Sequence, residues 1–218
     1  MNPEKALTDL SGKVVTITGG SRGIGKEIAL AFSRCGAKVV IASRKRENCT
    51  ALAEHITETI GTEALPVACH VGQWDQCDEL FSTVYDHFGK CDVLINNAGM
   101  SPLYKSLPDV SQDLFDKVMN VNLRGPFRLS ALFGQQMFND GNGSIINVSS
   151  IAAAQPSPHE VPYGAAKAGL HSLTKSFSRA YAPHVRVNCI MPGPFLTDIS
   201  DAWSCLLYTS DAADDHHR

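Results

Sequence analysis

Short apolar runs rich in β-branched residues alternate with helical stretches along most of this chain, and that alternation limits the fold more than any other feature. The runs typical of strands are residues 13–18, 38–43, 64–71, 92–99, 143–150 and 185–193. Apolar residues at helical spacing fill the stretches between them, and several of these stretches end at glycine. Strict alternation predicts a parallel sheet covered by helices on both faces, and right-handed crossovers make it doubly wound. We therefore expect a Rossmann-like α/β fold.

The chain reads as a single domain, because no internal repeat, low-complexity segment or linker interrupts residues 10–203. Long helices are expected over residues 111–138 and 161–182, and Gly125-Pro126 predicts an irregularity in the first of them. Ligands of such sheets bind beyond the carboxyl ends of the strands. The residues that follow each strand are therefore the candidates for chemistry.

The composition is that of a globular protein and excludes several functions. Hydrophobic residues make up 44% of the 218 residues, charged residues 19%, and the formal net charge is −3. Without a basic surface, the chain is not expected to bind nucleic acid or an anionic membrane. It has neither an apolar signal-peptide run at its start nor the ~20 apolar residues of a membrane span, so we expect a cytoplasmic protein. The seven cysteines include no CxxC pair, which predicts neither disulfides nor a metal site.

A glycine-rich turn, TGGSRGIG at residues 18–25, joins the first strand to the first helix. Gly19 can make the tight turn, and the absence of Cβ atoms lets backbone N–H groups approach a pyrophosphate. The positive end of the following helix favours the same anion. The turn predicts a dinucleotide site, and a glycine-rich loop without a ligand is the alternative.

The spacing TGxxxGxG and five further motifs resemble the short-chain dehydrogenase/reductase family over about residues 10–203. The further motifs, in chain order, are NNAG (96–99), Asn122 within NVNL, Ser150 at the end of the fifth strand, YGAAK (163–167) and PGPFLT (192–197). Each occurs at the strand end or helix where the fold needs it. The resemblance implies an oxidoreductase that moves a hydride between a nicotinamide cofactor and a carbonyl or secondary alcohol.

The end of the second strand predicts which nicotinamide cofactor is used. An NAD enzyme offers an acidic residue there, whereas this chain has Ser43 and Arg44. Arg44 can make a forked contact with a 2′-phosphate, and Arg22 can approach it from the glycine turn. We therefore expect NADP(H). The alternative is that residues 44–46 only begin a solvated helix.

The resemblance also implies a set of cofactor-binding residues. They are Gly19, Ser21, Arg22, Gly23, Ile24, Gly25, Ser43, Arg44, His70, Val71, Asn97, Ala98, Gly99, Tyr163, Lys167, Pro192, Gly193 and Thr197. His70 departs from the family, which has an aspartate that faces the adenine amino group. An imidazole can still accept from that amine if its tautomer allows, although a structural histidine is as good an interpretation.

Tyr163 and Lys167 lie four residues apart on an expected helix and so share one face. A phenol with a pKa near 10 needs a downward shift of about 3 units to be half ionised at pH 7. A neighbouring ammonium and the positive nicotinamide would both favour the phenolate. By resemblance, Tyr163 exchanges a proton with the substrate oxygen and Ser150 hydrogen-bonds that oxygen. Asn122 holds a water that relays protons through Lys167.

Three nearby residues offer competing assignments. The family spacing favours Ser150 over Ser149 and Asn122 over Asn120, and we expect His159 to face solvent rather than line the substrate cleft. The competing functions are a carbonyl reductase, a 3-oxoacyl-thioester reductase that uses the same residues, and a cofactor-binding fragment without activity. The resemblance further implies a homodimer or homotetramer assembled through the two long helices.

The last residues do not match the family. Relatives continue past the position of Ser204 with a lid over the substrate, another helix and a seventh strand, whereas residues 205–218 resemble a translated sequencing adapter. We expect residues 1–204 to be a truncated oxidoreductase domain and residues 205–218 a non-native tail in which His216 and His217 bind no metal. Such a chain is expected to be marginally stable and poorly active, and deletion of 205–218 to change little.

Overall fold

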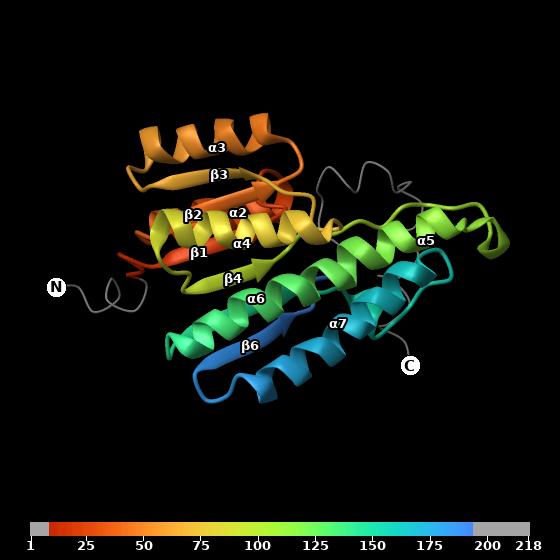
Figure 1. The fold of residues 1–218 in the computed structure, drawn as a ribbon. Coiled ribbons are helices and arrows are strands. Elements are labelled where there is room, and N and C mark those ends of the chain that lie inside the picture. The colour runs from red at the N-terminus through yellow and green to blue at the C-terminus, as the bar shows by residue number, and fades with distance from the viewer. Residues whose placement is uncertain (1–8, 194–218) are drawn as a thin grey trace, which may run out of the picture.

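The computed structural model describes residues 9–193 and contains a parallel sheet of six strands flanked by helices (Figure 1). The strands are β1 Val14–Thr18, β2 Lys38–Ser43, β3 Ala64–Ala68, β4 Val93–Asn96, β5 Gly143–Val148 and β6 Val185–Ile190. The helices are α2 Gly23–Arg34, α3 Arg46–Thr59, α4 Trp74–Phe88, α5 Gln112–Met119, α6 Gly125–Asn139 and α7 Val161–Ala180, with short 3₁₀ turns at Leu107–Asp109 and Ile151–Ala153. The predicted α/β fold is confirmed.

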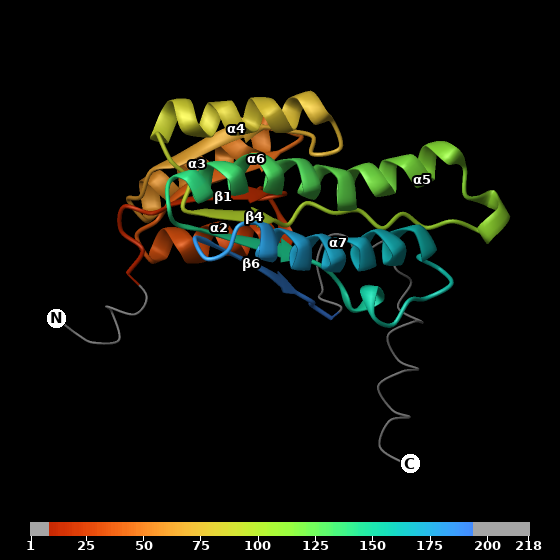
Figure 2. The same ribbon diagram turned by 60° about the horizontal axis from the view of Figure 1, so that its bottom comes forward.

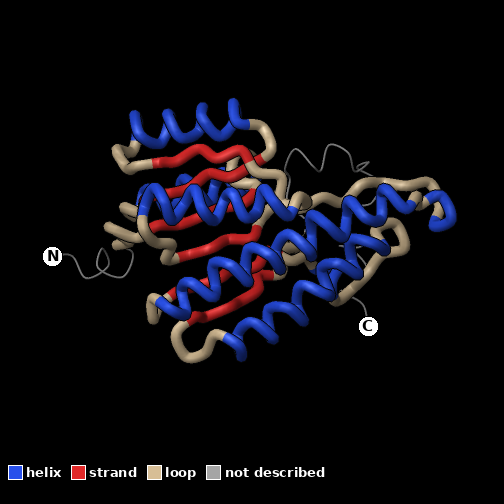
Figure 3. Tube along the Cα trace, viewed as in Figure 1, coloured by secondary structure: helices blue, strands red, loops and turns tan. Residues whose placement is uncertain are grey.

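The strands lie in the order β3-β2-β1-β4-β5-β6, and every pair is parallel. The chain moves outward from β1 to β3 and then returns to β4 on the other side of β1, so the strand order reverses between β1 and β4. This reversal is where an open α/β sheet forms its ligand crevice. Figure 3 shows the strands side by side, and in Figure 1 α5 and the start of α7 extend beyond their ends.

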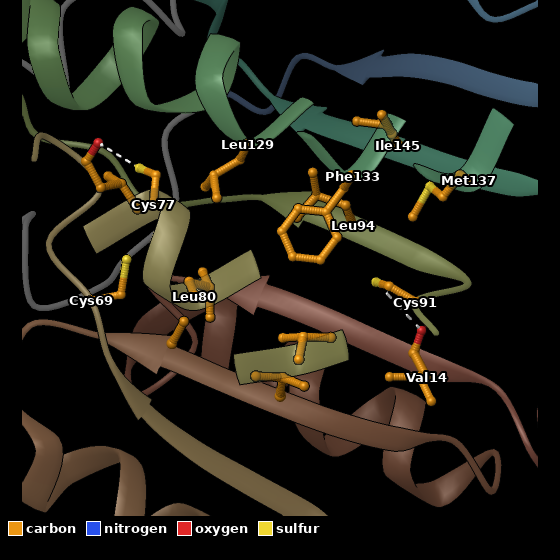
Figure 4. Close-up of a cluster of buried hydrophobic side chains, with 14 of the residues drawn as sticks. Val14, Cys69, Cys77, Leu80, Cys91, Leu94, Leu129, Phe133, Met137 and Ile145 are labelled. Atoms are coloured by element: carbon orange, nitrogen blue, oxygen red, sulfur yellow. Dashed lines mark hydrogen bonds between the residues drawn. The ribbon is translucent and has the colours of Figure 1, made fainter. Parts of the chain in front are cut away.

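Two hydrophobic cores lie on opposite faces of the sheet because side chains alternate along each strand. On one face Ala29 of α2 and Ile56 of α3 pack against Ile17. On the other, Leu80 of α4 and Phe133 of α6 pack against strand residues that include Leu94 and Ile145 (Figure 4). In Figure 2 the sheet lies between α4 and α6 above and α2 below. All five residues of β1 are buried, as expected for a strand covered on both faces.

A buried chain of polar side chains joins α6, β4, β5 and α7 through the second of these cores. The strand register pairs Asn96 with Asn147, and the Asn96 amide donates to Asn147 Oδ1 at 2.9 Å and to Ser130 Oγ at 3.0 Å. Asn147 Nδ2 donates to Thr174 Oγ1 at 2.9 Å, and Thr174 donates to the carbonyl of Leu170 at 2.8 Å. Because buried polar groups are costly unless paired, this chain fixes both helices relative to the strands that carry the candidate site.

The long helix predicted over 111–138 is interrupted one turn earlier than expected. Residues Asn120–Arg124 form a π-helical turn in which the Gly125 N–H bonds to the carbonyl of Asn120, five residues back. Pro126 cannot donate to the carbonyl four residues before it, which weakens the α-helical register at this point. A Cβ atom at Gly125 would collide with the carbonyl oxygen of Val71. Glycine therefore allows the helix to approach the loop after β3.

The strands β3, β4, β5 and β6 end two to three residues before the predicted boundaries, because the residues that follow turn away into loops. None of the helices within residues 9–193 is both long and apolar enough to cross a membrane. No cluster of three or more potential metal ligands occurs in the same range.

We predict that Asn147→Ala lowers the free energy of unfolding by about 2–3 kcal/mol, because Asn96 and Thr174 each lose one buried hydrogen bond and a polar side chain is removed from the core. Urea denaturation followed by circular dichroism measures the change. Ser176→Ala, on the exposed side of α7, is the control and should be near neutral. Equal stability of the two variants would contradict the structural role of the buried chain.

Candidate active site

The predicted site residues within the described range lie at or after the carboxyl ends of the six strands, in the π-helical turn and at the start of α7. The side chain of Asn97 fastens the glycine turn to the loop after β4, because its amide donates to the carbonyls of Thr18 at 3.0 Å and Gly19 at 3.2 Å. Thr18 Oγ1 accepts in return from the backbone N–H groups of Asn97 and Ala98, each at 3.1 Å. The side chain of Asn97 therefore holds the glycine turn in place.

The glycines of the turn are required by conformation or by packing. Gly19 and Gly23 have φ values of +63° and +51°, in the region that favours glycine. A Cβ at Gly19 would lie 2.9 Å from Ala98 Cα, and one at Gly25 would collide with the carbonyl of Gly19. The first turn of α2 packs so closely on the preceding loop that only a residue without a side chain fits.

The N-terminus of α2 is open to an anion. Its N-cap residue is Arg22, whose side chain makes no hydrogen bond to the helix N–H groups, and the first turn of the helix has no acidic residue. The first backbone N–H groups of a helix have no partners within the helix and carry the positive end of its dipole. The turn therefore offers the donors and the positive helix end that suit a pyrophosphate.

Ser43, one of the residues expected to choose the cofactor, contacts the glycine turn. Ser43, at the end of β2, lies 2.8 Å from Ser21 between hydroxyl oxygens, and its oxygen is 3.1 Å from the sulfur of Cys49. Arg22 and Arg44 are exposed at the same edge of the sheet. Cys49 is fully buried on α3, and its link to Ser43 was not predicted because nothing in the sequence places the thiol beneath that hydroxyl.

The ring and the backbone of His70 are both held by contacts within its own loop and with the start of α4. Its Nδ1 accepts the backbone N–H of Gly72 at 3.1 Å, and its own backbone N–H donates to the Gln76 side chain at 2.7 Å. The neutral ring therefore carries its proton on Nε2, which can donate but not accept. Its Nδ1 is thus already engaged by the backbone of its own loop. Val71, which follows it, is buried in the core.

Lys167 is buried beneath the site and is held by backbone. It is 3% exposed, and its Nζ donates to the carbonyl of Val148 at 2.7 Å. Burial lowers the pKa of Lys167 to about 8, and Cys189 opposes the shift weakly. A Cβ built on Gly99 would lie 3.1 Å from Asn122 Oδ1 and 3.6 Å from Lys167 Nζ, so these three residues meet at one point.

The side chain of Asn122 is fully buried in the π-helical turn. Its Nδ2 donates to the carbonyls of Met100 and Val118 at 2.8 and 2.9 Å, and its Oδ1 accepts the N–H of Met100 at 3.2 Å. Asn122 thus fixes the loop after β4 directly above Lys167. Asn120, the alternative, lies at the start of the π turn and is only half-buried.

Tyr163 is half-buried in the first turn of α7, and its ring centroid lies 5.6 Å from Lys167 Nζ. Burial raises the pKa of Tyr163, the Ser150 hydroxyl opposes the rise, and the negative charge of Glu160 adds to it. The direction is opposite to the one expected beside an ammonium and a bound nicotinamide, because burial outweighs the effect of the Ser150 hydroxyl and the Lys167 ammonium bonds to the carbonyl of Val148. The phenol is therefore held in its protonated form at neutral pH.

The two neighbouring serines differ in their surroundings. Ser149 is buried, and its hydroxyl donates to the carbonyl of Lys167 at 3.5 Å. Ser150 is half-buried, and its Oγ accepts the N–H of Ala152 at 3.2 Å. Since that contact leaves its hydroxyl proton free to donate and the Tyr163 phenol is a neighbour, the geometry favours Ser150 as the serine that faces a substrate.

A narrow crevice beside Tyr163 is lined by residues that the sequence did not predict to lie near the site. Its walls are Pro102, Tyr104, Leu114, Val118, Glu160, Pro162 and Tyr163. The Tyr104 hydroxyl donates to the carbonyl of Pro158 and accepts the N–H of Val161, both at 2.8 Å. Of these residues, Glu160 is one that the sequence could have indicated, because it lies three residues before Tyr163. His159 is exposed, as expected.

The loop after β6 reaches the same site. The carbonyl of Pro192 accepts the N–H of Ile151 at 3.2 Å, which ties this loop to the segment after Ser150. Gly193 is the last residue that the structure describes. Thr197 and the tail at 205–218 lie outside the described residues.

Comparison with known proteins identifies the family. The family model for short chain dehydrogenases matches residues 13–205. The chain is 36% identical over 195 residues to dehydrogenase/reductase SDR family member 4 of Homo sapiens, a match that covers 88% of this chain and 69% of that protein. It is 35% identical over 193 residues to the 3-oxoacyl-[acyl-carrier-protein] reductase FabG of Thermotoga maritima, covering 88% and 78% of the two chains.

Solved structures agree with this result. A metagenomic short-chain oxidoreductase in complex with NADP superposes with a TM-score of 0.81 at 36% identity, over 85% of this chain and 84% of that one. An NAD⁺-bound xylitol dehydrogenase superposes with a TM-score of 0.80 at 30% identity, over 84% and 70% of the two chains. With a family model that spans most of its length and relatives above 30% identity, this chain belongs to the short-chain dehydrogenase/reductase family of oxidoreductases.

Proposed function

We propose that this chain is an NADPH-dependent oxidoreductase that transfers a hydride between the cofactor and a carbonyl or secondary alcohol. The convergence of Tyr163, Ser150 and Lys167 beside the glycine turn carries the proposal. The uncapped helix N-terminus and the Cβ-free turn fit the pyrophosphate of a dinucleotide. When bound, the nicotinamide supplies or receives the hydride.

The chain's own residues handle the proton and the substrate oxygen. A Tyr163 phenol that burial keeps protonated is in the form that donates a proton during carbonyl reduction. Ser150 hydrogen-bonds the same substrate oxygen and fixes its position. Lys167, whose depressed pKa allows it to exchange a proton near neutral pH, and the adjacent Asn122 form the route by which Tyr163 is reprotonated.

The preference for NADP(H) rests on the residues at the end of β2, because the relatives are divided between the two cofactors. The first residue after β2 is Arg44 rather than a carboxylate that would repel a 2′-phosphate, and Arg22 follows Ser21, whose hydroxyl contacts that of Ser43; both arginines are exposed. Two guanidinium groups and a hydroxyl form a suitable set of donors for a phosphate dianion.

The second candidate function is reduction of a 3-oxoacyl thioester. The similarity to a 3-oxoacyl-[acyl-carrier-protein] reductase over 193 residues favours it, and the same three side chains would perform the reaction. NADPH oxidation assayed with acyl thioesters and with simple ketones separates the two functions. A chain that binds NADPH but turns over neither class would be a cofactor-binding protein without activity.

We also infer a homodimer or homotetramer in the cytoplasm. Phe115 of α5 and Phe127 of α6 are 45% and 39% exposed, and both lie on the long helical region expected to pair with a second subunit. Large exposed apolar side chains on that region would be covered by association with a second subunit.

We predict that Tyr163→Phe abolishes turnover and leaves NADPH affinity nearly unchanged, because the hydroxyl acts on the substrate oxygen. NADPH fluorescence titration and steady-state rates measure the two quantities. Substantial turnover by the variant would remove Tyr163 from the role of acid.

We predict that Arg44→Ala weakens NADPH binding about tenfold or more and leaves NADH binding nearly unchanged, since it removes a charge-assisted contact to the 2′-phosphate. Lys45→Ala, which removes an exposed cation one residue further on, is the matched control and should preserve the preference. If both variants weaken the binding of NADPH and NADH by the same factor, Arg44 contributes only non-specific electrostatic attraction. The proposed preference for NADPH would then be wrong.

A further inference from the structure

Cys49 places a buried thiol beneath the hydroxyl of Ser43, at the edge of the sheet proposed to select the cofactor. It lies in the first turn of α3 and has no exposed surface. Its sulfur is 3.1 Å from Ser43 Oγ, 3.7 Å from the carbonyl oxygen of Val67 in β3 and 3.9 Å from the carbonyl oxygen of Ser43. The thiol therefore joins α3 to the ends of β2 and β3 at the corner where the chain leaves the sheet.

The surroundings of the sulfur favour the thiol as a donor to the Ser43 hydroxyl. Both carbonyl oxygens lie farther from the sulfur than Ser43 Oγ does, and the carbonyl of Ser43 already accepts the backbone N–H of Cys69 at 2.9 Å. A hydroxyl oxygen has two lone pairs and one proton. Ser43 Oγ can thus accept from Cys49 and still make its 2.8 Å contact with Ser21 Oγ.

A count of protons shows what the two hydroxyls can offer a ligand. The side chains of Cys49, Ser43 and Ser21 carry three protons and share two contacts, so one proton is left over. When Cys49 donates, the remaining proton belongs to one of the half-buried serines and is available to a ligand. When Ser43 donates to the sulfur instead, the hydroxyls offer only lone pairs. A phosphate dianion accepts hydrogen bonds and so needs the first arrangement, whereas a ribose hydroxyl can bind to either.

We propose that Cys49 is a positioning residue for the 2′-phosphate of NADPH: its thiol holds the Ser43 hydroxyl from beneath, so that Ser43 and Ser21 present a proton to the phosphate. This assignment rests on the proposed function for the identity of the cofactor. A ligand cannot touch a side chain without exposed surface, so Cys49 acts through Ser43. Removal of the thiol frees the Ser43 side chain to rotate, and a donor that must be ordered on binding contributes less affinity.

The test measures the affinities of NADPH and NADH by fluorescence titration and uses their ratio as the readout. Cys49→Ala should reduce the preference for NADPH about threefold to tenfold, the value of one hydrogen bond, and leave NADH binding unchanged. Cys49→Val, which fills the space without a donor, should give the same result, and Cys49→Ser should recover most of the preference. In a Ser43→Ala background, Cys49→Ala should have no further effect.

Cys91→Ala is the matched control. Cys91 is also a buried thiol, and its sulfur is 3.3 Å from the hydroxyl of Thr16, but it lies near the amino ends of β1 and β4 (Figure 4). Its replacement should lower the melting temperature, as Cys49→Ala does, and leave the cofactor preference at the wild-type value.

Three results overturn the proposal: a wild type without a preference for NADPH, a preference that Cys49→Ala and Cys49→Val leave intact, or an additive loss in the double variant. Equal weakening of NADPH and NADH by these variants also overturns it, because a purely structural role predicts that result. A preference that depends on Cys49, in a chain that oxidises NADPH with neither ketones nor acyl thioesters, would support the assignment of Cys49 and contradict the proposed oxidoreductase function. The two failures can therefore be told apart.

Discussion

The hydrogen bond from the Lys167 ammonium to the carbonyl of Val148 is the contact on which the arrangement of the candidate site depends. It joins α7 to the end of β5 at 2.7 Å in a place where the ammonium is 3% exposed. A buried cation is costly unless it is well bonded, so this contact fixes the height of α7 above the sheet. Tyr163, one turn earlier on the same helix, is thereby placed beside Ser150.

Further contacts fix the loop after β4 and the glycine turn relative to Lys167. Gly99 leaves the space in which Asn122 and Lys167 meet, Asn122 holds the backbone of Met100, and Asn97 holds the turn through Thr18 and Gly19. The buried chain from Ser130 to Thr174 fixes α6 and α7 to the same two strands. The glycine turn and Tyr163, where we propose that cofactor and substrate bind, are therefore positioned by one connected set of contacts.

Much of this was predictable because the signals are local. Strand and helix types follow from periodicity, and the positive φ angles at Gly19 and Gly23 follow from a turn that admits only glycine. The parallel sheet then brings the residues after β1, β4 and β5 together without further information. Four side chains assigned from motifs, namely Asn122, Ser150, Tyr163 and Lys167, do meet at those strand ends.

What was missed depends on contacts between distant parts of the chain. Tyr104 meets Pro158 and Val161 across 54 and 57 residues, and no periodicity reports such a pairing. The direction of the Tyr163 pKa shift depends on burial and on where the Lys167 ammonium points, which only the folded arrangement decides. The His70 tautomer is set by a backbone N–H two residues away, and loop geometry rather than residue type places it there.

The most direct test of this account is the titration of the Lys167 side chain by heteronuclear NMR, with Lys167→Arg used to assign its signal. Because burial disfavours the charged form, the account predicts a midpoint near pH 8 for the chain without cofactor, well below the value of about 10.4 for an unperturbed lysine. A midpoint at or above the ordinary lysine value would show a solvated ammonium, and would contradict the claim that a buried Lys167 organises the site.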